Sequence, residues 1–297
     1  MRTLPFRCSA HSEEHSESQV GTASTVRAFL LIEVRGPWGV DAVRENRLPA
    51  QVKVQLARLA NRHNVRLLVI RRHGRSTPSN ITVFAAYADP VAPWAETACL
   101  GDPADLLSLD LAALAAGRSL GLSAHPSPLF LVCTHGKHDI CCAERGRPIA
   151  AALHKSDPED TWEVSHIGGD RFAGNLLVLP DGLYYGRLSP TAAATVAERH
   201  REGHLEIDYL RGRCGYPFPV QAAEIFLRRQ LDLTGIDALT LTARASNQAQ
   251  TEAVFTDGSR TWTVHVETTR TSPEQLTCRA SQNSEATSHT ELAITPR

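Results

Sequence analysis

Two cysteines and a histidine, carried by two neighbouring loops, are the side chains of this chain best suited to chemistry. The first loop lies in LVCTHGKHDICCAERGR, residues 131–147, and the second in WEVSHIGGDRF, residues 162–172. Thiolate is a preferred ligand of iron in sulfide-bridged clusters, and imidazole can replace thiolate on one of two irons. Cys133, Cys142 and His166 therefore form a candidate metal-binding set.

Several alternative roles for these residues stay open. Free cysteines are often buried as small apolar side chains, so Cys133, Cys141 and Cys142 could be core residues. Two cysteines with His166 and Asp170 would also make a tetrahedral zinc site. A thiol oxidoreductase is disfavoured because the chain has no Cys-x-x-Cys pair at a helix start. A cofactor-free scaffold protein is the remaining alternative.

Strands and helices must bring the two loops together. A strand over residues 128–133 carries Cys133 to its loop, and Pro148 marks an early position of a helix predicted over residues 148–153. The other predicted elements here are strands over residues 162–164, 176–179 and 183–187 and helices over residues 191–202 and 220–233. A central sheet with flanking helices is compatible with a thioredoxin-like arrangement.

The predicted fold class is α/β (α+β) with two domains. The N-terminal elements are strands over residues 28–35, 65–72 and 81–87 and helices over residues 48–61 and 102–121. From residue 239 onward, alternating β-rich segments indicate a small antiparallel sheet. The predicted division is a flexible segment 1–24, an α/β domain 25–125, a second domain 126–235, an antiparallel extension 236–280 and a poorly ordered tail 281–297.

Charge and hydropathy exclude several classes of protein. A formal net charge of -1 does not favour nucleic-acid binding, which needs a strongly basic surface. The first twenty residues lack the apolar stretch of a secretory signal, and no apolar run approaches the ~20 residues that span a bilayer. We therefore expect a cytoplasmic protein without membrane contact.

Two long motifs resemble the sucrase/ferredoxin-like family, which includes thioredoxin-like ferredoxins. They are CTHGKHDICCAERGRPIA, residues 133–150, and SHIGGDRFAGNLLVLPDGLYYGRL, residues 165–188. Shorter agreements, such as LLIEVRGPWG and YLRGRCGYPFPVQAAE, extend the resemblance from about residue 8 to about residue 233.

The resemblance implies a thioredoxin-like ferredoxin domain that binds a 2Fe-2S cluster. Its ligands in the family are two cysteines nine positions apart and a His-x-x-x-His pair. Cys133, Cys142 and His166 match three of these positions, and Asp170 stands where the family has its second histidine. The expected function is soluble electron transfer rather than stand-alone catalysis, and nothing supports sucrase activity.

The fourth ligand is the open point of this prediction. Asp170 could coordinate iron through a carboxylate oxygen, or it could cap the turn or pair with Arg171. His138 would then be a substitute ligand, whereas His135 is expected to make a loop hydrogen bond. Cys141 is expected to face away from the centre, because neighbouring side chains of an extended chain point in opposite directions.

Basic residues crowd the two motifs and suggest a partner. Lys137, Arg145, Arg147 and Arg171 would attract an acidic redox protein, although their presence fits solvated loop charges equally well. The donor and acceptor are not indicated by the sequence.

Overall fold

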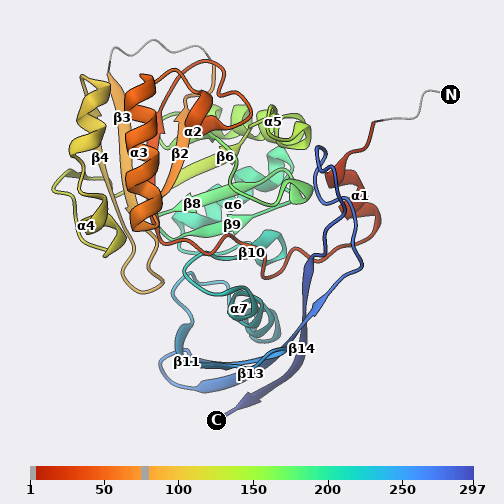
Figure 1. Ribbon diagram of the computed structural model, residues 1–297. Coiled ribbons are helices and arrows are strands. Elements are labelled where there is room, and N and C mark those ends of the chain that lie inside the picture. Colours follow the sequence, from red (N-terminus) through yellow and green to blue (C-terminus); the bar gives the residue numbers. More distant parts are fainter. Residues whose placement is uncertain (1–4, 75–79) are drawn as a thin grey trace.

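The computed structural model describes residues 5–74 and 80–297 and arranges most of their strands in one large mixed sheet (Figure 1). Its strands are β1 (Ala28–Glu33), β2 (Arg66–Arg71), β3 (Ile81–Tyr87), β4 (Trp94–Leu100), β5 (Ser123–Ala124), β6 (Leu129–Cys133), β7 (Thr161–Val164), β8 (Leu176–Leu179), β9 (Leu183–Tyr185) and β10 (Leu210–Arg213). They lie in the order β10-β9-β8-β6-β7-β2-β1-β3-β4-β5. The mixed α/β class expected from the sequence is confirmed.

Helices cover the sheet. The α-helices of the described residues are α1 (Cys8–Glu14), α2 (Ala42–Glu45), α3 (Ala50–His63), α4 (Leu111–Ala115), α5 (Ile140–Ser156), α6 (Pro190–Arg201) and α7 (Phe218–Leu231), and short 3-10 helices span Pro103–Ser108, Asp170–Phe172 and Ile207–Tyr209. Leu56 of α3 packs on the β1 side, and Leu153 of α5 packs with α6 on the β6 side. Helices α3, α6 and α7 match the predictions closely.

The two predicted α/β domains share this sheet. β2 pairs with β7 in the antiparallel direction, with Arg71 opposite Glu163. Leu31 of β1 and Leu131 of β6 belong to one buried apolar cluster. The boundary predicted between residues 125 and 126 therefore joins two parts of a continuous hydrogen-bonded sheet, which β5 closes at its far edge.

A second, antiparallel sheet follows α7. Its strands are β11 (Thr240–Ser246), β12 (Gln250–Thr256), β13 (Thr261–Arg270) and β14 (Thr287–Pro296), in that order. The small antiparallel sheet predicted from residue 239 is confirmed, but the poorly ordered tail is not. β14 lies within residues 281–297 and sets Ile294 opposite Val264 of β13. Its threonines and isoleucine suit a strand once a neighbour supplies the hydrogen bonds.

The helix predicted over residues 148–153 is longer than expected. α5 begins at Ile140 because the side chain of Asp139 accepts a hydrogen bond from the backbone N–H of Cys141 at 2.9 Å, which caps the helix start. Pro148 is an interior residue of this helix rather than an early one. The segment that the sequence suggested as a loop thus carries Cys141 and Cys142 on the first helical turn.

The N-terminal segment, expected to be flexible, is ordered over its described residues. α1 begins at Cys8, whose side chain is only 1% exposed. The helix predicted over residues 102–121 divides into a 3-10 helix and α4, because Asp102 and Asp110 cap two separate starts. Within the described ranges, no helix combines the length and apolar character needed to cross a membrane.

Candidate metal centre

Cys133 and Cys142 are brought together by β6 and the first turn of α5. Both side chains are buried and belong to one apolar cluster. The helix can approach the strand because Gly146 has no side chain. A Cβ at this position would lie 2.0 Å from the carbonyl oxygen of Cys133.

His166 and Asp170 complete the set from the loop after β7. Nδ1 of His166 lies 2.9 Å from Oδ1 of Asp170, and the same oxygen accepts a hydrogen bond from Sγ of Cys142 at 3.0 Å. Asp170 is 3% exposed. Asp170 thus contacts both Cys142 and the half-buried His166, and Cys133 lies in the same buried cluster as Cys142. We call the four predicted site residues the primary centre: Cys133, Cys142, His166 and Asp170.

Two further histidines lie beside the primary centre. The ring of His138 stacks on that of His166 with centroids 3.8 Å apart, and its Nε2 lies 3.7 Å from Oδ2 of Asp170. The potential ligand atoms of His138, His166 and Asp170 all lie within 4.8 Å of one another. His135 instead bonds the carbonyl oxygen of Gly39 and the backbone N–H of His166, as expected for a loop-supporting residue.

The electrostatics of the primary centre pair a carboxylate with an imidazole. Burial disfavours both charged forms, but the contact with His166 holds the pKa of Asp170 below its usual value, and Asp170 raises the pKa of His166. The neighbouring Cys133, together with burial, raises the pKa of Cys142. The alternative pairing of Asp170 with Arg171 does not form, because Arg171 bonds Glu17 at 2.6 Å.

Arg211 supports this loop, although no role was predicted for it from the sequence. Its buried guanidinium donates to the carbonyl oxygen of Gly168 at 2.9 Å, to Oδ1 of Asn175 at 2.8 Å and to the carbonyl oxygen of Thr22 at 2.6 Å. Gly169 has a positive φ of 78°, and a Cβ there would collide with the guanidinium. The motif RGRCGYP, which begins at Arg211, is the sequence feature that could have indicated a role for this residue.

A second group of metal-ligating side chains lies on the other side of the same helical turn. We call it the clasp cluster, and its members are Cys8, Asp139, Cys141 and Cys278. Cys141 was correctly expected to avoid the primary centre, but for the wrong reason, because it lies on a helix and not on extended chain. The hydrogen bond from Cys8 is the largest of the effects that lower the pKa of Cys141 to about 6.

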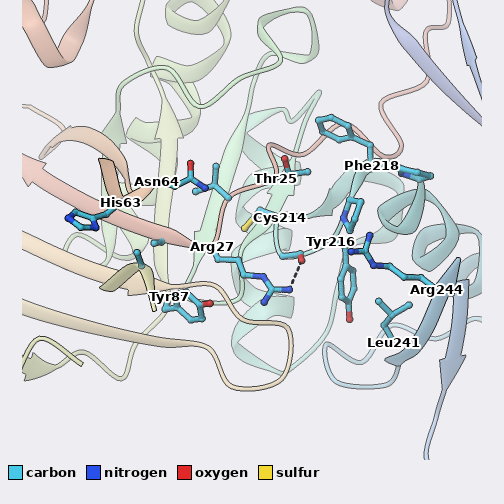
Figure 2. A pocket seen from close by; sticks show the side chains of 16 residues that line it. Thr25, Arg27, His63, Asn64, Tyr87, Cys214, Tyr216, Phe218, Leu241 and Arg244 are labelled. Atoms are coloured by element: carbon cyan, nitrogen blue, oxygen red, sulfur yellow. Dashed lines mark hydrogen bonds between the residues drawn. The ribbon is translucent and has the colours of Figure 1, made fainter. Parts of the chain in front are cut away.

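A hollow of about 650 Å³ lies elsewhere on the described surface, between Arg27, Tyr87 and Arg244. Figure 2 shows Arg27 donating to the carbonyl oxygen of Gly215 at its wall. None of its lining residues belongs to the primary centre or the clasp cluster. The buried thiol of Cys214, which also lines it, has a pKa raised to about 12 by burial, so it is not a ready nucleophile.

One short pattern is of a kind that hydrolases use. Residues 117–121 read GRSLG, the spacing of a nucleophile elbow. The segment follows α4 rather than a strand, and the hydroxyl of Ser119 bonds the carboxylate of Glu96. No histidine contacts Ser119 among the hydrogen bonds of the described chain, so the pattern does not form a hydrolase site here.

Comparison with known proteins identifies the family. The model of the sucrase/ferredoxin-like family matches residues 19–212, which is more than half of the chain. The chain belongs to the sucrase/ferredoxin-like family. The resemblance carried by the two long motifs is thereby confirmed. No solved structure matches the chain.

Similar proteins from yeasts are named altered inheritance of mitochondria protein 32. The protein of Candida glabrata is 28% identical over 98 residues, which are 28% of this chain and 31% of that protein. The protein of Saccharomyces cerevisiae is 33% identical over 96 residues, 28% of this chain and 31% of that protein. The match thus spans less than a third of these relatives.

These names correct the functional prediction. The relatives are named for the inheritance of mitochondria, and their names mention neither an iron–sulfur cluster nor electron transfer. The expectation that this chain is a soluble iron–sulfur electron carrier is therefore wrong. What holds is coarser: the protein has groups of Cys, His and Asp residues that could hold a metal, in a family whose name mentions ferredoxin.

The predicted partner and location gain no support from the same findings. Arg145 and Arg171, which suggested an acidic partner, are ion-paired with Glu13 and Glu17 of the N-terminal segment. The acidic partner and the cytoplasmic location both stay predictions.

Proposed function

We propose that this protein binds a metal through the primary centre. The observation that carries the proposal is the position of Asp170, a buried carboxylate in contact with an imidazole and a thiol. Burying ionisable groups is costly unless they are paired or hold a metal. Three donor types, from a strand end, a helical turn and a loop, converge on one place, which suits a preformed site.

For the group held there, we propose a two-iron, two-sulfur cluster. The donors divide into a thiolate pair, Cys133 and Cys142, and a non-thiolate pair, His166 and Asp170. That division suits a cluster in which non-thiolate ligands serve one of the two irons. The proposed role is binding of this group, not the delivery of electrons to a partner.

The metal and sulfide content of the full chain tests both statements. Protein purified without oxygen should contain about two iron atoms and two acid-labile sulfides per chain. Cys142→Ser should lose both, and Cys99→Ser, which changes an exposed cysteine, should keep both. Zinc without sulfide would overturn the cluster while keeping metal binding. Protein that takes up no metal at the primary centre would overturn both.

A second experiment asks which non-thiolate residue is the fourth ligand. Asp170→His restores the histidine of the family motif and should keep the metal, whereas Asp170→Ala should reduce metal content several-fold. His138→Ala should leave it close to the parent value, because His138 only stacks on His166 and approaches Asp170 no closer than 3.7 Å. A larger loss of metal in His138→Ala than in Asp170→Ala would assign His138 as the ligand.

We also propose that residues 126–235 have the thioredoxin-like arrangement that the family resemblance implies. Its support is the parallel pair β6 and β7 joined through α5, followed by the antiparallel strands β8 and β9 on the other side of β6. The primary centre would then lie at the carboxyl end of the first strand of this unit.

A further inference from the structure

The clasp cluster joins the two ends of the chain to the start of α5. Cys8 opens α1, Cys278 lies between β13 and β14, and Asp139 and Cys141 stand at the beginning of α5. One ligand atom from each residue lies within 4.8 Å of the others. In Figure 1 the red helix α1 and the blue segment before β14 lie beside each other at one edge of the molecule.

The spacing of these atoms suits a tetrahedral ion. Sγ of Cys278 lies 3.4 Å from Sγ of Cys141 and 3.5 Å from Sγ of Cys8. Sγ of Cys8 lies 3.6 and 3.7 Å from the two oxygens of Asp139. Zinc bonds of about 2.3 Å to sulfur and about 2.1 Å to oxygen would separate tetrahedral ligands by about 3.8 and 3.6 Å.

The charges of the cluster favour a cation. Asp139 is fully buried and, within the described ranges, forms no salt bridge. Its two oxygens each accept one backbone N–H, from Cys141 at 2.9 Å and from Cys278 at 2.7 Å, which leaves acceptor positions free. The nearby guanidinium of Arg7 is bonded to Glu144 instead.

We propose that Cys8, Asp139, Cys141 and Cys278 bind one zinc ion that fastens both ends of the chain to α5. Three sulfurs and one oxygen are a tetrahedral set, and the burial of Cys8 and Cys141 fits a closed, structural site. Zinc replaces the thiol protons, which leave to solvent, and no electron is transferred. The ion would close a loop between residues 8 and 278.

The alternative for three neighbouring cysteines is a disulfide. The separations of Sγ of Cys278 from the other two sulfurs, 3.4 and 3.5 Å, exceed the roughly 2.05 Å of a bonded pair. A disulfide would also leave the third cysteine unpaired and the charge of Asp139 without a cation, whereas one zinc ion uses all four residues.

Zinc content after reconstitution is the test. The full chain, stripped with a chelator under reducing conditions and given zinc, should hold about one more zinc per chain than Cys278→Ser treated in the same way. Cys8→Ser, near the end of the chain where folding is least at risk, should show the same loss. Cys99→Ser should bind as much zinc as the parent does. Cys142→Ser should also keep the zinc of the clasp cluster.

Two further measurements complete the experiment. Cobalt in place of zinc should give the intense visible bands of a tetrahedral thiolate site, and these should be lost in Cys278→Ser but kept in Cys142→Ser. Alkylation should modify Cys8, Cys141 and Cys278 only after a chelator is added, without a reductant. Equal zinc content in the parent and Cys278→Ser, or peptides joined by a disulfide between any two of the three cysteines, would overturn the proposal.

Discussion

The primary centre and the clasp cluster share one helical turn but differ in how the chain builds them. Adjacent residues on a helix diverge by about 100°, so Cys142 faces one group and Cys141 the other. The primary centre comes from one stretch, residues 133–170, whereas the clasp cluster collects residues from positions 8 to 278. The capped start of α5 thus contributes one cysteine to a site built from a single stretch of the chain and another to a cluster built from distant stretches.

The primary centre and the clasp cluster also differ in the residues that hold their ligands in place. The loop of the primary centre rests on Arg211 and Asn175, and its two strand ends are joined through Glu163. The clasp cluster relies mainly on Asp139, which caps α5 and accepts the N–H of Cys278. We therefore expect changes in the supporting residues of the primary centre to affect that centre and spare the clasp cluster.

Arg211→Lys should have the largest effect. Lysine cannot bridge Thr22, Gly168 and Asn175 at once, because its single ammonium lacks the planar fork of arginine. We expect a loss of about 3 kcal/mol in the free energy of unfolding, measured with urea. Metal affinity at the primary centre should fall about 10- to 100-fold, as for other residues that orient ligands.

The matched control is Arg229→Lys, on the exposed side of α7. Its free energy of unfolding should stay within about 0.5 kcal/mol of the parent value, as is usual for surface substitutions. Equal losses of metal at the primary centre and the clasp cluster in Arg211→Lys would break the distinction between them.

Gly146→Ala should have the next largest effect. Helix propensity alone would favour alanine by about 1 kcal/mol. The new Cβ, however, would lie 2.0 Å from the carbonyl oxygen of Cys133, so α5 must move away from β6. We expect a net destabilisation of about 2 kcal/mol in urea unfolding and weaker metal binding at the primary centre.

Gly101→Ala is the control for this variant, because a Cβ there meets no atom within 4 Å. Its free energy of unfolding should change by less than about 0.5 kcal/mol. A Gly146→Ala protein as stable as the parent would mean that α5 tolerates displacement from the strand.

The contrast between the two groups also accounts for what the sequence could reveal. Cys133, Cys142, His166 and Asp170 lie in two compact motifs, and the structure places Asp170 in contact with Cys142 and His166. Cys8 and Cys278 have no neighbouring partner in the sequence. Only the folded path of the chain places them beside Cys141, so spacing alone could not identify the clasp cluster.

The fold was predictable where local patterns decide it. Seven strands of the large sheet and helices α3, α6 and α7 follow apolar periodicity, whereas β4, β5 and β10 were not predicted. The start of α5 was missed because its signal is a single capping residue, Asp139, within a polar stretch. β14 was missed because its polar composition suggested disorder, and its pairing with β13 is a tertiary contact.

Glu163→Gln should lower the free energy of unfolding less than Arg211→Lys or Gly146→Ala does. The pH dependence of this loss tests the role of the Glu163 charge more directly than its size. Glu163 bonds Arg71 at 2.7 Å and the hydroxyl of Thr134 at 2.8 Å, next to Cys133. Burial opposes its charge, but Arg71 and these hydrogen bonds hold the pKa of Glu163 below its usual value. Glutamine keeps the shape and loses the charge, so we expect a cost of about 1 kcal/mol at neutral pH.

The sign of the pH effect follows from this lowered pKa. The stabilisation by Glu163 is fully present above the unfolded pKa of about 4.3 and is lost as the pH falls through the lower folded value. The difference in unfolding free energy between the parent and Glu163→Gln should therefore shrink as the pH falls below about 4. Glu159→Gln, a change at an exposed residue paired loosely with Arg72, should show no such difference. A difference that grows on acidification would show that the charge of Glu163 does not hold the strand ends of the primary centre together.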